Sequence, residues 1–327
     1  MSLLLYIVAV IIIVALIVGL YEKSTNAICT SKKRLDGKTA IVTGGTTGMG
    51  LQIATDLADR GARVIIACPF KNEGVDALKY ITDNTSNTDV VFKILDLSSI
   101  ASIREFAKDI INNEKRLDIL MNNAGVGAVS EFITDDGMSF IMQVNYFGQF
   151  LLTLLLLPLL NKTGTTTDPA RIVNTSSVLH NLGFINMNKI NDIRYWFPVQ
   201  FYANSKLCLV LFAHELTKRL KRNNVVVNCV DPGMVGTGIF RCVGNILGGV
   251  VTVIGFVLFK TPWLGAQTAL HVALDKKAGE LSGQFFKNCK LTRAKRSAYN
   301  DKVAVQLWNT SASLVGLSSE EIEKCFQ

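Results

Sequence analysis

The stretch K-T-A-I-V-T-G-G-T-T-G-M-G, residues Lys38 to Gly50, places an apolar, β-branched run immediately before a cluster of glycines. A helix-competent segment, Leu51 to Arg60, follows it. A strand, a glycine turn and a helix in this order form a corner where backbone N–H groups and a helix N-terminus can bind an anion such as a pyrophosphate. The glycine spacing differs from the G-x-G-x-x-G fingerprint. Taken alone, the stretch leaves nucleotide binding and an ordinary loop equally open.

The composition sets the size and class of the protein. Its 327 residues, 49% of them hydrophobic, suffice for one large α/β domain with appendages or for two small domains. The net charge of +8 comes from dispersed lysines and arginines. This pattern favours solvated helix faces and membrane-flanking charge over nucleic-acid binding. The seven cysteines form no C-x-x-C pair, which indicates reduced, cytosol-side thiols and no metal site.

The N-terminus carries an apolar segment without charge, Leu3 to Leu20. As a helix it would span roughly 27 Å, close to the hydrocarbon thickness of a bilayer. No basic residue precedes it, which favours an anchor over a cleaved signal peptide. Basic residues follow it at Lys23 and at 32–34, so the positive-inside rule places the rest of the chain in the cytosol. We expect a membrane anchor at 1–21 and a polar tether at 22–36.

Buried-strand and helical patterns alternate along the body of the chain. We expect strands at 40–43, 63–67, 90–94, 117–121, 171–175, 225–230 and 283–287, and helices at 51–60, 72–83, 98–113, 140–160 and 200–222. This alternation predicts an α/β fold with a single doubly wound parallel sheet of the Rossmann type, whose ligand crevice lies at the carboxyl ends of the strands. The domain should cover 37–310, with a tail at 311–327. Asn145, Gln149 and the flanking strands favour an interior helix over a second membrane span at 140–160.

Tyr202 and Lys206 are four residues apart in a helical segment, so their side chains leave the same face. A neighbouring ammonium lowers the pKa of a phenol, which makes the pair a usable general acid and base at neutral pH. Such a pair also arises by chance in chains of this composition. The spacing therefore needs other motifs to support it.

Those motifs are present in a fixed order: T-G-x-x-x-G-x-G at 43–50, N-N-A-G at 122–125, Ser177, Y-x-x-x-K at 202–206 and P-G at 232–233. With this ordered set, the chain resembles the short-chain dehydrogenase/reductase family from about Asp36 to about Trp308. The membrane anchor, the spacing between Ser177 and Tyr202, and the region around 265–268 and 307–309 are most similar to its microsomal retinol dehydrogenase branch.

The resemblance implies roles for four residues in catalysis. Tyr202 would be the general acid/base, and Ser177 would hydrogen-bond the substrate oxygen as charge develops on it. Lys206 would lower the pKa of Tyr202 and hold the nicotinamide ribose. Asn145 would support a water-mediated proton relay to that lysine. Ser176 is expected to be a structural hydroxyl at the strand end.

The resemblance also implies a nicotinamide cofactor, with NADP expected and NAD still open. The residues that would hold it are Gly44, Gly48, Met49, Gly50, Lys71, Asp96, Asn123, Ala124, Gly125, Tyr202, Lys206, Pro232, Gly233, Val235 and Thr237. Two departures from the branch stand out. The arginine that would pair with a 2′-phosphate is replaced by Pro69, which leaves Lys71 as the nearest cation, and Asp231 stands where the branch often has histidine.

We therefore expect a single-pass protein of the endoplasmic reticulum membrane whose cytosolic domain interconverts a lipophilic alcohol and its carbonyl. A retinoid is the leading substrate, and a hydroxysteroid or fatty aldehyde is the alternative within the enzyme class. A catalytically silent protein that binds lipid surfaces is the alternative from another class. The apolar segment 242–259 should not cross the bilayer, because the strand at 283–287 belongs to the same sheet as the strand at 40–43. It is expected to be a substrate-covering lid that rests on the membrane, or else a buried helix pair.

Overall fold

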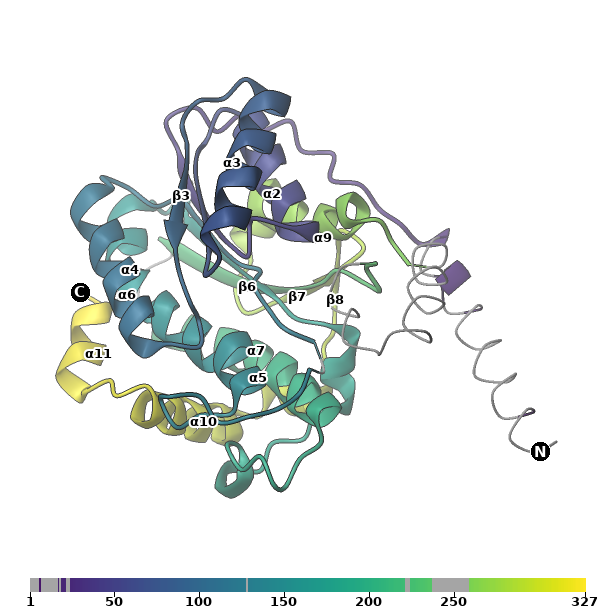
Figure 1. Ribbon diagram of the computed structural model, residues 1–327, viewed down its shortest axis with the longest axis vertical. Coiled ribbons are helices and arrows are strands. Elements are labelled where there is room, and N and C mark those ends of the chain that lie inside the picture. The colour runs from purple at the N-terminus through teal and green to yellow at the C-terminus, as the bar shows by residue number, and fades with distance from the viewer. Residues whose placement is uncertain are drawn as a thin grey trace.

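A mostly parallel sheet forms the centre of the molecule (Figure 1). The computed structural model describes residues 24–127, 129–220, 224–236 and 259–327, together with residues 6, 17 and 19–21. The strand order is β3-β2-β1-β4-β5-β6-β7-β8, and only β8 runs antiparallel to its neighbour. The strands are β1 Thr39–Thr43, β2 Arg63–Cys68, β3 Val90–Ile94, β4 Ile119–Asn122, β5 Ala170–Thr175, β6 Val225–Asp231, β7 Phe285–Lys287 and β8 Lys290–Thr292.

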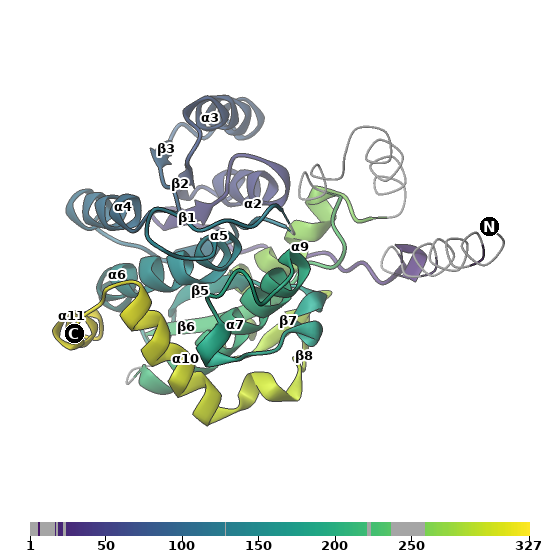
Figure 2. The same ribbon diagram turned by 60° about the horizontal axis from the view of Figure 1, so that its bottom comes forward.

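Helices cover both faces of this sheet, as Figures 1 and 2 show. The helical segments are α2 Gly48–Asp59, α3 Lys71–Thr85, α4 Ile100–Asn113, α5 Phe140–Met142, the π-helical turn η1 Gln143–Phe147, α6 Gly148–Thr163, α7 Pro198–Arg219, α9 Pro262–Leu274, α10 Asp301–Leu314 and α11 Ser319–Cys325. Short 3-10 segments are η2 Val178–Leu182, η3 Met187–Lys189, η5 Ala278–Glu280 and η6 Arg296–Tyr299.

The alternation of side chains along β1 divides the core into two layers. Ile41 packs with α4, α6 and α7 on one face, whereas Ala40 and Val42 pack with α2, α3 and α9 on the other. Both faces are apolar because a parallel sheet is covered on both sides, which is why its strands read as continuous apolar runs in the sequence. Helices α10 and α11 pack outside the first helical layer, against α7 and α6.

The predicted doubly wound sheet is confirmed. Each of the seven predicted strands is present with its ends displaced by at most two residues, including the last, which pairs with β6 as β7. The sequence did not predict β8, α9, α10 or α11. Residues 311–327, expected to be a tail, contain the end of α10 and all of α11, with Val315, Leu317 and Cys325 buried.

The apolar helix at 140–160 is interior, as predicted. Within the described part of the chain, Phe140–Thr163 is the only helix with the length and composition of a membrane span, and 83% of its most apolar window is buried in the protein. It continues through Pro158 and contains the π-helical turn η1, which the sequence did not predict. Most of the expected anchor at 1–21 and all of the expected lid at 242–259 except Phe259 lie outside the described residues.

The chain reverses its winding between β1 and β4, which are neighbours in the sheet. In open α/β sheets the ligand crevice lies at the carboxyl ends of the strands at such a switch point. Gly44 follows β1 directly, Asn123 follows β4, and Asp96 lies just after β3. The fold therefore gathers these three predicted residues at one edge of the sheet.

Candidate active site

The corner between β1 and α2 has the geometry of an anion cradle. A Cβ atom at Gly50 would lie 2.1 Å from the carbonyl oxygen of Gly44, so any side chain there would displace the turn. Gly44 and Gly48 both adopt positive φ angles, which favour glycine. The Thr47 side chain does not cap α2, so the N–H groups of its first turn, which includes Met49, remain available to a ligand. The corner thus fits the pyrophosphate of a dinucleotide.

The loop after β4 is fastened to this corner. The Asn123 side-chain amide donates to the carbonyl oxygen of Thr43 at 2.9 Å, and the Thr43 hydroxyl accepts from the backbone N–H groups of Asn123 and Ala124, each at 3.0 Å. A Cβ atom at Gly44 would come within 2.9 Å of the Cα of Ala124. The predicted residues of the two loops therefore form one rigid surface.

The side chains near the ends of β2 and β3 include an acid, Glu73, that is not among the predicted cofactor residues. Asp96 accepts hydrogen bonds from the Ser98 hydroxyl and backbone, which fix its carboxylate at the end of β3. Lys71 begins α3 and is exposed. Glu73, two residues further in the first turn of α3, accepts from the Thr46 hydroxyl at 3.3 Å. The sequence could have indicated this residue, because Glu73 is an acid in the first turn of the helix that follows the second strand.

Ser177, Tyr202 and Lys206, three of the four residues expected to take part in catalysis, come together next to the end of β5. Ser177 starts the bend into η2, and its hydroxyl accepts from the backbone N–H of Leu179 at 3.2 Å. The phenol of Tyr202 on α7 lies close enough for this side chain to lower the pKa of the phenol. The ammonium of Lys206, one turn further along α7, lies 5.5 Å from the centre of the Tyr202 ring and donates to the carbonyl oxygen of Thr175 at 2.9 Å.

Burial dominates the electrostatics of these groups. Burial raises the pKa of Tyr202, the neighbouring Ser177 side chain opposes that rise, and the charge of Asp231 adds to it. Burial also lowers the pKa of Lys206 to about 8. The sequence analysis expected Lys206 to lower the pKa of Tyr202, yet here desolvation has the largest influence on both groups. That expectation stays a prediction.

Asn145 lies in the π-helical turn η1, and its amide is fully engaged. Its Oδ1 accepts from the backbone N–H of Val126 at 2.8 Å, and its Nδ2 donates to the Val126 carbonyl at 2.9 Å and to the Ser205 hydroxyl at 3.2 Å. A Cβ atom at Gly125 would lie 3.2 Å from Asn145 Oδ1 and 3.3 Å from Lys206 Nζ. The loop after β4, η1 and α7 therefore converge at this glycine. Single-turn π-helices often mark functional sites, and this one places the asparagine at the junction.

Ser176 has the structural position expected of it. Its hydroxyl is buried and donates to the carbonyl oxygen of Lys206 at 2.9 Å, which fastens α7 to the end of β5. The Ser177 hydroxyl, in contrast, accepts from the backbone N–H of Leu179 and lies beside Tyr202. The catalytic role of Ser177 stays a prediction.

The loop after β6 contains Pro232, Gly233 and Val235. The Gly233 N–H donates to the Asp231 carboxylate at 3.0 Å, and Val235 forms an isolated parallel bridge with Lys260. This bridge brings together the two ends of the segment 237–258, which lies outside the described residues. The candidate cofactor residue Thr237 belongs to that segment.

His180 is a second residue near the site that the sequence analysis did not assign. Its Nδ1 lies 2.6 Å from the carbonyl oxygen of Ser177, and its Nε2 lies 3.1 Å from the backbone nitrogen of Lys295. Because the Lys295 N–H must donate, Nε2 accepts and Nδ1 carries the proton of a neutral ring. His180 therefore fastens the bend that carries Ser177 to the segment before η6.

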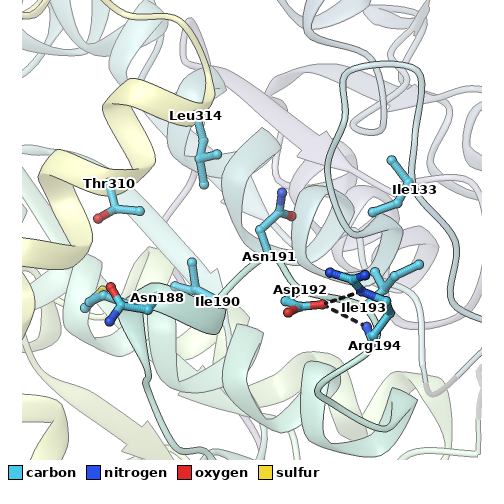
Figure 3. Close-up of a pocket in the computed structure, with 10 residues that line it drawn as sticks. Ile133, Asn188, Ile190, Asn191, Asp192, Ile193, Arg194, Thr310 and Leu314 are labelled. Carbon is cyan, nitrogen blue, oxygen red and sulfur yellow. Dashed lines mark hydrogen bonds and ion pairs between the residues drawn. The ribbon is translucent and has the colours of Figure 1, made fainter.

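A separate hollow lies on the outer side of the segment between Ser177 and Tyr202 (Figure 3). Its lining is mainly apolar, with an Asp192–Arg194 hydrogen bond on one side, and comprises Ile133, Met187, Asn188, Ile190, Asn191, Asp192, Ile193, Arg194, Thr310 and Leu314. Ser177, Tyr202 and Lys206 do not line it. The hollow is therefore distinct from the candidate active site.

Comparison with known proteins establishes the class. Residues 38–245 match the sequence profile of the short chain dehydrogenases. This match covers more than half of the chain, which therefore belongs to the short-chain dehydrogenase/reductase family. The protein is an oxidoreductase that acts on CH–OH groups with a nicotinamide cofactor.

Individual relatives refine this placement. The chain is 41% identical to retinol dehydrogenase 12 of Bos taurus over 295 residues, which cover 90% of this chain and 92% of that protein. It is 40% identical to retinol dehydrogenase 13 of Homo sapiens over 306 residues, covering 92% and 91% of the two chains. Among solved structures, the Pseudomonas aeruginosa RhlG/NADP active-site complex is similar with a TM-score of 0.62 and 28% identity, covering 78% of this chain and 95% of that one.

Proposed function

We propose that this protein interconverts a lipophilic alcohol and its aldehyde or ketone, with a retinoid as the leading substrate. The observation that carries the proposal is the convergence of Ser177, Tyr202 and Lys206 beside the glycine corner. The retinol dehydrogenases to which the chain is about 40% identical support the substrate class. Exposed apolar side chains on the segment between Ser177 and Tyr202 also favour a lipophilic ligand, among them Leu182, Phe184 and Phe197.

In this mechanism Ser177 and Tyr202 both bind the reacting oxygen of the substrate. When bound, the nicotinamide supplies or accepts the hydride. Tyr202 gives a proton to the oxygen during reduction and takes it back during oxidation. Ser177 donates a hydrogen bond as negative charge develops there. Lys206, held by the carbonyl of Thr175, keeps a positive charge beneath the tyrosine ring. Gly44, Gly48 and Gly50 would hold the pyrophosphate of the cofactor, and Asp96 and residues 123–125 would line its adenosine half.

The test is Tyr202→Phe, which removes the transferable proton and keeps the ring. Membranes that contain the full-length protein are assayed with retinal and with a ketosteroid, each against NADPH and NADH. We expect turnover to fall at least 100-fold while cofactor binding changes little. Lys206→Ala should damage both turnover and binding. Reduction of the best substrate at the parental rate by folded Tyr202→Phe protein would contradict the mechanism. Intact cofactor binding without turnover of any carbonyl by the parent would favour the silent lipid-surface binding protein.

For the cofactor, we propose a modest preference for NADP, with Lys71 as the cation that meets the 2′-phosphate. A lysine is a flexible point charge and should hold a phosphate less well than a bidentate arginine. Glu73 in the same helical turn would repel the phosphate and lowers the expected preference further. Lys71→Glu should weaken NADPH more than NADH, and Glu73→Gln should strengthen NADPH selectively. Equal changes in the dissociation constants of NADPH and NADH would show that Lys71 and Glu73 do not interact with the 2′-phosphate.

For the location, we propose a single-pass protein of the endoplasmic reticulum membrane with its catalytic domain in the cytosol. The uncharged segment Leu3 to Leu20, followed by basic residues, supports this orientation. The apolar segment 242–259 would be a lid that rests on the membrane and admits lipid-soluble substrate. A chain truncated before Tyr21 should retain binding to liposomes and lose it when Val253, Phe256 and Phe259 become serine. Complete partition of the truncated chain into buffer would exclude the membrane-resting lid.

A further inference from the structure

Asp231 is a buried carboxylate beside the candidate acid, and the mechanism above gives it no role. It is the last residue of β6 and is 2% exposed. On the neighbouring strand β5, Thr175 pairs with Val230, and the Ser176 N–H donates to the Val230 carbonyl at 2.8 Å. Asp231 therefore lies next to the bend that carries Ser177. Side chains alternate along β6: Cys229 packs in the cluster that contains α7, and Val230 packs in the cluster on the other face of the sheet. Asp231 therefore faces the same side as Cys229, which is the side covered by α7 and Tyr202.

Two contacts hold this carboxylate in place. Its Oδ1 accepts from the Gly233 N–H at 3.0 Å, which closes a turn over Pro232. Its Oδ2 lies 3.5 Å from the ammonium of Lys287, which occupies the paired position on β7. Because the two groups are 3.5 Å apart and the Lys287 side chain is partly exposed, the ammonium only partly offsets the negative charge of Asp231. The carboxylate therefore acts on its surroundings at a place with little solvent to screen it.

Within the described part of the chain, the charged and titratable groups around Tyr202 come from α7, η2, β6 and β7. Lys206 lies beneath the ring on α7, and Ser177, in the bend before η2, lowers the pKa of the phenol. Asp231 acts from β6, with Lys287 behind it on β7. His180, in η2, is neutral because both of its ring nitrogens are engaged. Among these groups, Asp231 is the one that opposes formation of the phenolate.

We propose that the Asp231–Lys287 pair is an electrostatic control on Tyr202, which holds the proton on the phenol and so sets the alkaline limit of carbonyl reduction. Reduction needs the protonated phenol and oxidation needs the phenolate. A negative charge nearby makes the phenolate less favourable. The rate of reduction is therefore maintained to a higher pH, and the rate of oxidation reaches its plateau at a higher pH. Asp231 acts through Tyr202 and does not touch the substrate in this scheme. The inference rests on the proposed function of Tyr202.

Asp231→Asn is the sharpest test, because the amide oxygen can still accept from Gly233 while the charge is lost. We expect the alkaline midpoint of kcat/KM for aldehyde reduction to fall by about half to one pH unit. Lys287→Met, which leaves the carboxylate unpaired, should move the same midpoint upward. Asp83→Asn, an exposed carboxylate on α3 paired with Lys79, is the matched control and should change nothing.

A second measurement does not depend on turnover. An ultraviolet difference titration of tyrosinate in the full-length protein, with the Tyr202→Phe titration subtracted, should show the same two shifts of midpoint. Unchanged midpoints in Asp231→Asn would overturn the inference, even if cofactor binding or stability fell. If Asp231→Asn fails to fold, an unchanged midpoint in Lys287→Met overturns it. Parental turnover in Tyr202→Phe would instead remove the proposed function itself, so the two failures are distinguishable.

Discussion

At the scale of single residues, the buried charge of Lys206 serves the proposed catalysis and lowers the free energy of unfolding. The residue is 3% exposed, and its ammonium has one hydrogen bond, to the carbonyl oxygen of Thr175, and no carboxylate partner within the described part of the chain. Burial lowers its pKa from 10.5 to about 8. Between these two values the unfolded chain binds more protons than the folded one, so the free energy of unfolding rises with pH across this window. At neutral pH the folded protein bears the full cost of a buried charge.

Lys206→Met should therefore raise stability while abolishing turnover. Methionine keeps the unbranched shape and removes the charge, which we expect to stabilise the protein by about 1–3 kcal/mol at pH 7. The rise in stability between pH 8 and 10.5 should disappear. Thermal unfolding of the two proteins across this pH range measures both effects. Lys79→Met, at an exposed lysine, is the control and should leave the pH dependence intact. A variant less stable than the parent at pH 7 would contradict this account.

At the scale of elements, the β1–α2 corner requires glycine for space at one position. Gly50→Ala would place its Cβ 2.1 Å from the Gly44 carbonyl and 2.5 Å from Asn123 Nδ2. We expect the corner to open and the dissociation constant of NADPH to rise at least tenfold, measured by fluorescence titration. Gly316→Ala is the control, because that glycine faces open space and its positive φ costs only about 1 kcal/mol of strain. Equal loss of cofactor binding in both variants would contradict a local effect.

Elements were predictable from the sequence where one physical signal dominated. Strands β1, β2, β4, β5 and β6 are buried on both faces, so continuous apolar runs predict them, whereas the edge strand β3 is only partly buried. β8 is a three-residue exposed edge strand. Its hairpin turn has Asn288 and Cys289 at positive φ, so the sequence lacks the glycine that usually indicates such a turn. The turn η1 leaves no mark in the apolar pattern. The sequence shows that residue 231 is an aspartate. Its proposed effect on the protonation of Tyr202 depends on its proximity to Lys287 and Tyr202, which only the folded sheet creates.

At the scale of the whole molecule, the C-terminal segment packs onto the outside of the helical layer that covers one face of the sheet. Figures 1 and 2 show α11 beside α6. Leu317 and Cys325 are buried in the larger core cluster, and the Phe326 ring lies 6.2 Å from that of Trp308. Arg104 on α4 donates to Glu321 at 2.8 Å. Both partners of this ion pair are more than a third exposed, so packing should contribute more than charge.

Deletion of residues 316–327 should therefore destabilise the whole domain. It removes Leu317, Cys325 and Phe326 from the core and uncovers Trp308, which we expect to cost about 3 kcal/mol or more from lost apolar burial. Arg104→Gln isolates the ion pair and should cost less than about 1 kcal/mol. Chemical denaturation of the parent, the deletion and Arg104→Gln compares the three free energies of unfolding. If the deletion costs no more than Arg104→Gln, α11 is an appendage held by charge, and the domain ends before it. If the deletion lowers the free energy of unfolding more than Arg104→Gln does, α11 is part of the catalytic fold. The reason is that α11 packs against α6, and α6 directly follows the turn η1 that contains Asn145.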